Sequence, residues 1–490
     1  MWAAGFDPGL RWGDVMEIDR SRGVAPAEFL AIILMSVCCI LFFVDRSRAQ
    51  ENRLFSYAGG ETVPALTADQ ESRAAAISSD ATQTDLKYVD AEPAALRGDT
   101  VAVPLAEGTL VLGLTHRIER AEDDFTWIGQ GSGEGGQTVL VVRDGQITGV
   151  IYDGFVQYSL TPLGGRLHAL TKIDPKAFPP DHPPGPLPVS PRDSRNRAGD
   201  LGGTAATVQI DILGAYTAEA LAANANIKNT IQLGVDLANA AYIASNAEVS
   251  LRLGGTMQVA GYSEAGKTYH DLLYNLTDGA GGMASVHAQR ETLGADLVAL
   301  FVNHTEYCGL AWVNSSAAYA FSVTTHTCVN SHTFSHELGH NFGALHDVAN
   351  SGSNPPYNYG YGYIHPQNLF RTIQSYGAPC GYCTRIGNFS NPDVTYNGHV
   401  TGTVTTHNVA RVHRERKSTV AAFRADKTPA KAVLISPKPG PGTTLGSTAT
   451  FVWTTGTGVT QYWLYVGSTG VGSYNIYQAG QGTSTSRTVS

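Results

Sequence analysis

The chain has 490 residues, a formal net charge of −9 and only 15% charged residues. Its length allows two to four domains, each able to bury its own core. An acidic chain without any run of Lys and Arg excludes a nucleic-acid-binding surface, and the low charge with 54 glycines suits a secreted protein with many turns.

The first 50 residues contain an apolar run, FLAIILMSVCCILFFV, at residues 29–44. This run is shorter than the roughly 20 residues that a membrane-spanning helix needs. Small residues follow it at Ser47 and Ala49 and offer a cleavage point. We therefore predict a signal peptide within residues 1–50 and a secreted mature chain without stable membrane association. A signal anchor and a buried core helix are the alternatives.

Residues 51–178 alternate between apolar and polar positions, as in DTVAVPL (99–105) and TVLVV (138–142), with glycine-rich turns between the segments. This pattern predicts a β-rich domain. The proline-rich stretch PPDHPPGPLPVSP (179–191) follows and excludes a regular element. We predict an exposed linker over residues 179–205, the kind of segment in which activating cleavages occur.

Strand and helix patterns alternate over residues 206–426. VQIDIL (208–213) alternates like a half-buried strand, and DLVALFV (296–302) is an apolar run that suits a central strand covered on both faces. Between them, apolar residues from Ile227 to Tyr242 are spaced for one face of a long helix. These patterns predict an α/β domain.

Short β-patterned segments occupy residues 427–490, for example ATFVW (449–453) and YWLYV (462–466). About five such segments are fewer than the roughly seven strands of a complete sandwich, so we predict an incomplete β-sandwich module. The whole chain is therefore expected to be a multidomain protein with an α/β domain between two β-rich ones.

The strongest motif is HELGHNFGALHD at residues 336–347. Residues four apart project from one face of a helix, so the rings of His336 and His340 can take adjacent corners of a tetrahedral zinc site. Gly343 lets the chain leave the helix through a conformation that other residues avoid, which brings His346 back as a third ligand. The fourth position remains for water or a peptide carbonyl. A histidine-rich surface helix is the alternative, but this spacing rarely arises by chance.

Glu337 lies one step around the helix, beside the metal rather than on it. A carboxylate there can take a proton from water and pass it to a leaving amine, as peptide hydrolysis requires. His332 lies one turn before His336 and precedes the motif. We expect it to be a solvated residue of the first turn rather than a ligand.

The stretch HELGHNFGALHD resembles the metzincin metallopeptidases, and Asp347 after the third histidine resembles their reprolysin (adamalysin) branch. FSVTTHTCVNSHTFSHELGH (321–340) and CGYCTRIGNFSNPDV (380–394) are similar to the approach to the active-site helix and to the region that closes the cleft in bacterial members. The resemblance implies the α/β metzincin fold with zinc as cofactor. The preceding domain then has the position of a propeptide, and the last domain that of an accessory sandwich similar to fibronectin type III.

YCGLAWV (307–313) is similar to the edge strand on which metzincins align an extended substrate. An unpaired strand can accept an extended peptide through main-chain hydrogen bonds that do not depend on sequence. An ordinary covered strand is the alternative. The resemblance implies substrate-binding roles for Gly309, Leu310, Ala311, Trp312 and Val313.

One position departs from the family pattern. Metzincins place a methionine beneath the zinc in a Met-turn, and the matching position in RTIQSYG is Gln374. No methionine follows Met283, so a shifted alignment restores none. Tyr376, two residues on, matches the place where some branches have a tyrosine that reaches the metal or the oxyanion. A packed tyrosine in the cleft wall is the alternative.

Four cysteines surround the motif, namely Cys308, Cys328, Cys380 and Cys383. Four cysteines allow three pairings, and an exported enzyme is expected to oxidise them. We favour Cys308–Cys328 with Cys380–Cys383. A zinc knuckle or a redox site at CGYC is the rival interpretation, but no second CxxC and no βαβ pattern accompanies it.

These features predict a secreted zinc endopeptidase that acts on proteins or peptides, uses Glu337 as general base and is made as a zymogen. Residues 51 to about 190 contain no cysteine that could cap the zinc, so blockage must be steric or use an oxygen or imidazole ligand, with His182 as one candidate. The alternative is a catalytically silent binding or adhesion protein. Its ligand could contact Trp453, Trp463 and Tyr465, although these aromatics are expected to be core residues. The intact Glu337 favours the enzyme, because only chemistry requires it.

Overall fold

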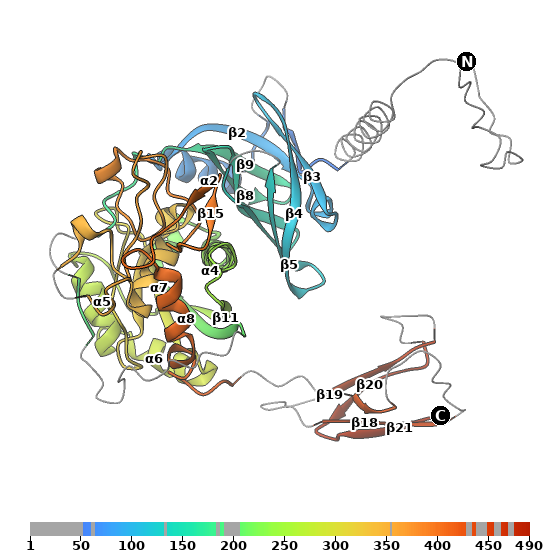
Figure 1. Cartoon of the computed structure of the whole chain (residues 1–490). Helices are drawn as coiled ribbons and strands as arrows, with labels where there is room; N and C mark the ends of the chain where they lie inside the picture. The colour runs from blue at the N-terminus through green and yellow to red at the C-terminus, as the bar shows by residue number, and fades with distance from the viewer. Residues whose placement is uncertain are drawn as a thin grey trace, which may run out of the picture.

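The computed structural model describes residues 52–59, 64–131, 135–182, 187–190, 206–352, 355–427, 434–437, 448–454, 462–468 and 475–490 (Figure 1). The predicted signal peptide within residues 1–50 lies outside the described residues. Inside the described ranges, no helix combines the length and the apolar character that crossing a membrane requires.

The N-terminal part is an antiparallel sheet with the strand order β1-β2-β9-β8-β7-β6-β5-β4-β3, accompanied by the helix α2 (Ala68–Ser79). A bridge between Arg53, just before β1, and Ala102 in β3 joins the two ends of this order, so the sheet curls back on itself. Alternation of apolar and polar residues thus produces the strands that the sequence predicts. They are β1 (Phe55–Tyr57), β2 (Gln83–Ala91), β3 (Thr100–Leu105), β4 (Gly108–Ala121), β5 (Asp124–Gly131), β6 (Thr138–Arg143), β7 (Gln146–Asp153), β8 (Val156–Gly164) and β9 (Leu167–Ile173).

A second sheet, with the order β11-β10-β12-β14-β13, organises the middle of the chain. Its first four strands are parallel, and β13 pairs antiparallel with β14 at the edge. The apolar run at residues 296–302 forms the central strand, as predicted. The strands are β10 (Val208–Tyr216), β11 (Val249–Gln258), β12 (Leu297–Val302), β13 (Gly309–Ala311) and β14 (Phe321–Thr325).

Helices cover both faces of this sheet. Alternate residues of β12 belong to two separate apolar clusters, with Phe301 in one and Leu300 in the other. The helices α4 (Ile227–Ala244), α7 (Thr333–Phe342) and α8 (Val409–Val420) pack in the first cluster, while α5 (Tyr269–Asp278) and α6 (Ala284–Leu293) pack in the second. Two shorter elements complete the unit, the helix α3 (Ala218–Ala223) and the hairpin of β15 (Thr395–Tyr396) with β16 (His399–Val400).

The N-terminal sheet packs directly against α4 (Figure 1). Ile128 and Val139 belong to the same buried cluster as the apolar face of that helix. Polar contacts reinforce this interface, because Arg120 Nη1 lies 3.1 Å from the buried Asp236 Oδ2. Since α4 also contacts α7, the N-terminal sheet shares a core with the helix that carries the histidine motif.

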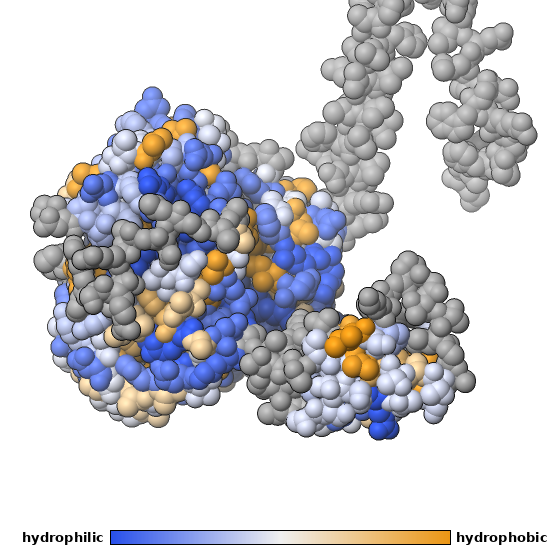
Figure 2. Space-filling view, turned by 60° about the horizontal axis from the view of Figure 1, so that its bottom comes forward, coloured by the Kyte–Doolittle hydropathy of each residue, from blue (hydrophilic) through white to orange (hydrophobic). Residues whose placement is uncertain are grey.

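The last residues form two small sheets, one of β17 (Leu434–Ser436), β18 (Ala449–Trp453) and β21 (Ser486–Val489), the other of β19 (Tyr462–Val466) and β20 (Tyr477–Gly482). Trp453 lies in their core, as expected. The expectation is wrong for Trp463 and Tyr465, which are 56% and 53% exposed because they point away from Trp453 on alternate positions of β19. Hydrophobic residues on the visible face of the molecule are otherwise scattered in small groups (Figure 2).

Candidate active site

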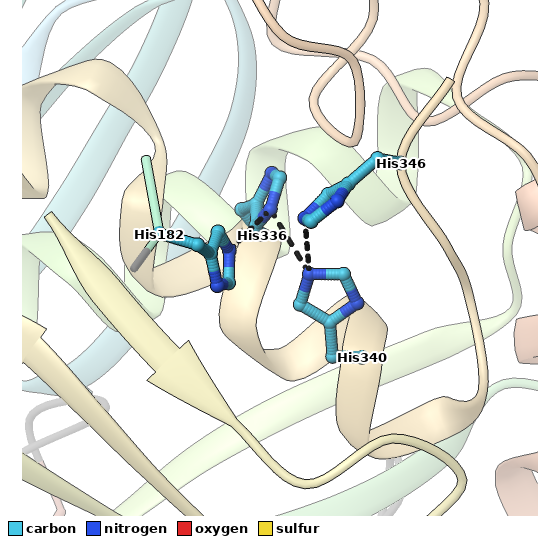
Figure 3. A group of neighbouring side chains, drawn as sticks. All are labelled: His182, His336, His340 and His346. Carbon is cyan, nitrogen blue, oxygen red and sulfur yellow. Dashed lines mark hydrogen bonds between the residues drawn. The ribbon is translucent and has the colours of Figure 1, made fainter. Parts of the chain in front are cut away.

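Helix α7 brings the first two histidines of the motif together. Within α7, His336 and His340 lie on one face, and their Nε2 atoms are 3.0 Å apart (Figure 3). The helix ends at Gly343, whose φ of +110° is in the left-handed region that favours glycine. The chain then returns so that His346 Nε2 lies 3.0 Å from His340 Nε2. Three ring nitrogens therefore converge on one point.

The outer nitrogen of each ring faces a backbone carbonyl. The Nδ1 atoms of His336 and His340 are 2.8 Å from the carbonyl oxygens of Ile373 and Ala344, and His346 Nδ1 is 3.4 Å from that of Asn350. A carbonyl oxygen only accepts, so each Nδ1 carries the proton and each Nε2 presents a lone pair. Burial lowers the pKa of all three rings, that of His340 to about 4, which keeps them neutral.

A fourth histidine completes the cluster from outside the motif. His182 Nε2 lies 2.9 Å from His336 Nε2 and 3.3 Å from Glu337 Oε1. The potential ligand atoms of His182, His336, His340 and His346 all lie within 4.8 Å of one another, and all four side chains are buried (Figure 3). His182, the imidazole that the sequence offered as one candidate for latency, thus lies at the histidine cluster.

This arrangement fits a tetrahedral cation. Because the three motif rings have their protons on Nδ1, their Nε2 lone pairs cannot hydrogen-bond to one another and would repel without a positive charge between them. Zn–N bonds of about 2.0–2.1 Å place the corners of a tetrahedron roughly 3.3 Å apart. The observed separations of 2.9 and 3.0 Å are close to that value. Together with their burial, this makes the cluster a candidate metal centre.

The carboxylate of Glu337 lies beside the cluster in a fully buried position. Neither of its oxygens has a hydrogen-bond partner among the described residues. Burial raises the pKa of Glu337 well above its ordinary range, and Asp181 adds to the shift. A buried carboxylate without a hydrogen bond, beside a candidate metal centre, is suited to accept a proton from a bound molecule.

The described residues of the proline-rich stretch lie along this site. The expectation of an exposed linker is wrong for His182 and Ser190, which are buried, whereas Pro180 and Val189 are exposed. The main chain of the segment pairs with the edge strand and its continuation. The edge strand and its flanking residues donate three main-chain hydrogen bonds, from Cys308 N to Pro180 O (2.9 Å), Gly309 N to Asp181 O (3.0 Å) and Val313 N to Pro188 O (2.9 Å). One further bond runs the other way, from Ser190 N to Val313 O (3.0 Å).

The edge strand can therefore align an extended segment, and here it aligns one of the chain's own. The bridge between Val189 and Val313 is parallel. Leu310 and Trp312 point into the core below, where Trp312 donates from Nε1 to Thr277 Oγ1 at 2.8 Å. The side of the edge strand that faces residues 180–190 is therefore its main chain, which pairs with them at Gly309 and Val313, and not the side chains of Leu310 and Trp312.

Tyr376 and Gln374 border the histidines from the segment that follows the motif. The ring of Tyr376 lies 4.2 Å from the ring of His346, centroid to centroid, and the Tyr376 N–H donates to Asp347 Oδ2 at 3.1 Å. Gln374 is fully buried, and neither atom of its amide has a partner among the described residues. The amide packs against Gly339 on α7, between the two helical histidines.

Two disulfides hold the surrounding segments. Cys308 pairs with Cys328, and Cys380 pairs with Cys383, which is the pairing favoured from the sequence. The first links the start of the edge strand to the turn before α7.

The prediction that His332 is a solvated residue of the first helical turn is wrong, because its side chain is buried. Its Nε2 lies 3.4 Å from the hydroxyl of Tyr152 in the N-terminal sheet. The N-terminal domain covers it.

One charged residue at the site was not predicted from the sequence. Arg385 Nη2 lies 2.7 Å from Asp181 Oδ1, and the two side chains are 6% and 17% exposed. Arg385 is contained in the stretch CGYCTRIGNFSNPDV, which resembles a cleft-closing region, but no pattern there distinguished it from a surface arginine.

Known proteins resemble this chain over the same region. Residues 206–390 match the family Reprolysin_5, described as metallo-peptidase family M12. A peptidyl-Asp metalloendopeptidase of Stenotrophomonas maltophilia strain R551-3 is 35% identical over 305 residues, covering 60% of this chain and 72% of that protein. The protein of the same name from strain K279a has the same identity and coverage. Another of that name, from Xanthomonas campestris pv. campestris, is 34% identical over 295 residues, covering 59% of this chain and 70% of that protein.

Proposed function

The chain belongs to the reprolysin-like metallopeptidases of family M12 and is a metalloendopeptidase, and from that premise we propose a secreted zinc endopeptidase that is made in a latent form. Proteins or peptides are its substrates. The observation that carries the proposal is the convergence of the Nε2 atoms of His336, His340 and His346 in a buried cluster.

These three histidines hold the metal. Zinc is the ion that suits three neutral imidazoles with a fourth, exchangeable position. When bound, zinc supplies a Lewis acid that polarises the scissile carbonyl and makes water more acidic. The contribution of the chain is to keep the rings neutral by burial and to fix their orientation through the carbonyl groups that face each Nδ1.

Glu337 acts as the general base in this proposal. It takes a proton from the water that attacks the peptide carbonyl and passes it to the leaving amine. The position of Glu337 supports this role, because its buried carboxylate lies beside the histidine cluster, with Oε1 3.3 Å from His182 Nε2. Neither oxygen has a hydrogen bond among the described residues, so both can accept the proton of a bound water once His182, which lies 3.3 Å from Oε1, has left.

Tyr376 is a second catalytic group of the proposed site. Its ring lies against that of His346, and burial raises the pKa of its hydroxyl, which therefore stays protonated. A protonated hydroxyl at this place can donate a hydrogen bond to the carbonyl oxygen of the scissile bond as negative charge develops there.

The substrate is proposed to bind as an extended strand on residues 309–313, in place of the segment that pairs with them now. The relatives are named peptidyl-Asp metalloendopeptidases. We infer that this chain also hydrolyses bonds between a residue and the following aspartate.

Latency is proposed to come from His182. Its imidazole lies where water or the scissile carbonyl must bind, 2.9 Å from His336 Nε2. As a fourth nitrogen ligand it would close the metal site, and the main-chain pairing of residues 180 and 181 with the edge strand would exclude substrate at the same time. Activation then requires this segment to leave the cleft. Loss of the His182 side chain favours that departure, because the proposed metal then no longer holds the segment.

A mass-spectrometric digest of a peptide library tests the proposal. The full-length chain with His182→Ala is expected to cleave before aspartate, to lose activity when zinc is chelated and to regain it when zinc is restored. A correctly folded, zinc-loaded His182→Ala chain that cleaves no peptide would contradict the proposed function.

A further inference from the structure

Arg385 has an acidic partner only in the segment that blocks the site, as far as the described residues extend. Its Nη2 pairs with Asp181 Oδ1 at 2.7 Å. Its other hydrogen bonds go to neutral main-chain carbonyls, from Nη1 to Ser331 at 3.0 Å and from Nη2 to Ser375 at 3.3 Å. When the segment leaves, a nearly buried guanidinium loses the carboxylate that balances its charge. A buried charge without a partner is costly, so this site favours another carboxylate.

Asp181 occupies the place that a substrate residue needs. Its carbonyl accepts a hydrogen bond from Gly309 N–H at 3.0 Å, the kind of main-chain contact that an extended substrate makes. The next residue, His182, lies at the histidine cluster, where the scissile carbonyl must bind. Because the segment runs parallel to the edge strand, a substrate bound antiparallel to that strand has the residue after its scissile carbonyl where Asp181 lies now.

The surroundings of Arg385 offer room and a free hydrogen-bonding edge. A cavity of about 420 Å³ is lined by Asp181, Tyr376 and Arg385, among others. The Nε atom of Arg385 is buried and has no partner among the described residues. Since Nε and Nη2 lie on the same edge of the guanidinium plane, one carboxylate can bind both at once, whereas Asp181 is bonded to Nη2 alone.

We propose that Arg385 is the specificity-determining residue that binds the side chain of the substrate's aspartate, and that Asp181 fills this subsite while the chain is latent. The inference rests on the proposed function and deepens it, because it assigns the residue that distinguishes aspartate from other side chains. Asp181 in the latent chain then imitates a substrate in two contacts. Its main-chain carbonyl accepts a hydrogen bond from the edge strand, and its carboxylate pairs with Arg385.

The neighbouring guanidinium of Arg371 does not compete for this role. It donates from Nη1 to the carbonyl of Ser375 at 2.6 Å and from Nε to that of Cys383 at 3.2 Å. These bonds link the main chain around Ser375 to the main chain at Cys383. Its positive charge adds to that of Arg385 and strengthens the attraction for a carboxylate.

The test compares two peptides that differ only in having Asp or Asn after the scissile bond. In the zinc-loaded full-length chain with His182→Ala, we expect a strong preference for the Asp peptide, measured as a ratio of kcat/KM. Adding Arg385→Gln should lower that ratio roughly 100-fold, because it removes one partner of a buried charge pair. Arg385→Lys should lower it less, since it keeps the charge without the planar fork.

Two further measurements keep the inference independent of turnover and of folding. Fluorescence anisotropy of the Asp peptide on the chain with His182→Ala and Glu337→Gln should show the same loss when Arg385→Gln is added. Asp181→Asn, added to the full-length chain with His182→Ala, changes no residue of the central domain and should raise cleavage of the Asp peptide several-fold over His182→Ala alone.

The outcomes separate the two claims. An Asp-to-Asn ratio and an affinity that stay unchanged in folded Arg385→Gln would overturn the role of Arg385, as would Asp181→Asn without effect. A His182→Ala chain that cleaves neither peptide contradicts the proposed function instead, and the anisotropy comparison still decides whether Arg385 binds aspartate.

Discussion

Gly309 and Glu337 lie so close together that a side chain at residue 309 has no room. A β-carbon added there would lie 2.2 Å from Glu337 Oε1. The main-chain N–H of Gly309 also donates to the carbonyl of Asp181, so the same residue aligns an extended segment and leaves space for the carboxylate. The edge strand and the proposed base therefore constrain each other.

Gly309→Ala should displace Glu337 and lower kcat roughly 100-fold, since a shift of about 1 Å in a catalytic group can cost that much. Zinc content should not change, because the three atoms nearest to an added β-carbon all belong to Glu337 rather than to a ligand histidine. Gly254→Ala is the matched control on another strand, where the nearest atom to an added β-carbon is 3.5 Å away. Equal kinetics for the two variants in the His182→Ala chain would show that Glu337 tolerates the displacement.

Glu337→Gln should retain zinc and lose most activity. The amide keeps the shape of the side chain but cannot accept a proton from water, and losing a positioned general base typically costs about 10²- to 10⁴-fold. Elemental analysis and a fluorogenic peptide assay measure the two properties on the same sample. Near-normal turnover by the zinc-loaded variant would exclude the proposed base.

The sequence was most informative where chemistry and periodicity coincide. Residues 336–346 specify a helix, a glycine exit and three converging rings, because each step depends on local geometry. The central strand at residues 296–302 was equally predictable from its apolar composition. Both predictions use contacts between neighbours in sequence or within one element.

Contacts between distant segments were less predictable. His182 and His336 are 154 residues apart, and no spacing rule links them. The proline-rich composition around His182 indicated an exposed linker, but proline also suits an extended segment that pairs with an edge strand through its carbonyls. His332 was misjudged for a related reason, since the N-terminal sheet that buries it is not visible from helical periodicity.

His182→Ala should raise the activity of the full-length chain, because it vacates the fourth position of the proposed metal site. In the cobalt-loaded chains, the visible spectrum should change when the nitrogen ligand is replaced by water. His116→Ala, at an exposed histidine of the N-terminal sheet, is the control and should change neither property. Equal activity and identical spectra for His182→Ala and the unaltered chain would refute this mechanism of latency.

His413 should make the fold sensitive to acid. It is fully buried among Tyr242, Phe342 and Phe389, neither ring nitrogen has a partner among the described residues, and burial lowers its pKa to about 3. The unfolded chain binds a proton below its ordinary pKa of about 6.5 and the folded chain does not, so stability falls as pH drops from 6.5 towards 3.

Urea unfolding between pH 7 and pH 4 measures this effect. His413→Leu should reduce the pH slope of the free energy of unfolding by up to about 1.4 kcal/mol per pH unit in that window. His116→Leu, at the exposed control position, should leave the slope unchanged. Parallel curves for His413→Leu and the unaltered chain would mean that His413 does not set the acid sensitivity.

Gln374 is the departure from the family pattern, and its surroundings decide what a methionine would do there. A β-carbon on Gly339 would lie 2.4 Å from Gln374 Oε1, so the amide packs tightly beneath α7 without a hydrogen bond. It does not orient the ligands either, because the Nδ1 atoms of His336 and His340 face the carbonyls of Ile373 and Ala344.

Gln374→Met should therefore stabilise the fold and leave the site working. Burying an amide without partners costs roughly 1–3 kcal/mol, and methionine has nearly the same length without that demand. We expect the free energy of unfolding to rise by about 1–2 kcal/mol, zinc affinity to stay constant, and activity to stay within about tenfold, equivalent to 1.4 kcal/mol in the barrier. Gln374→Glu, with the same shape and a buried charge, is the control and should destabilise the chain. A native chain that binds zinc but becomes active only after Gln374→Met would show that this substitution had silenced the enzyme, and the binding-protein alternative would then be favoured.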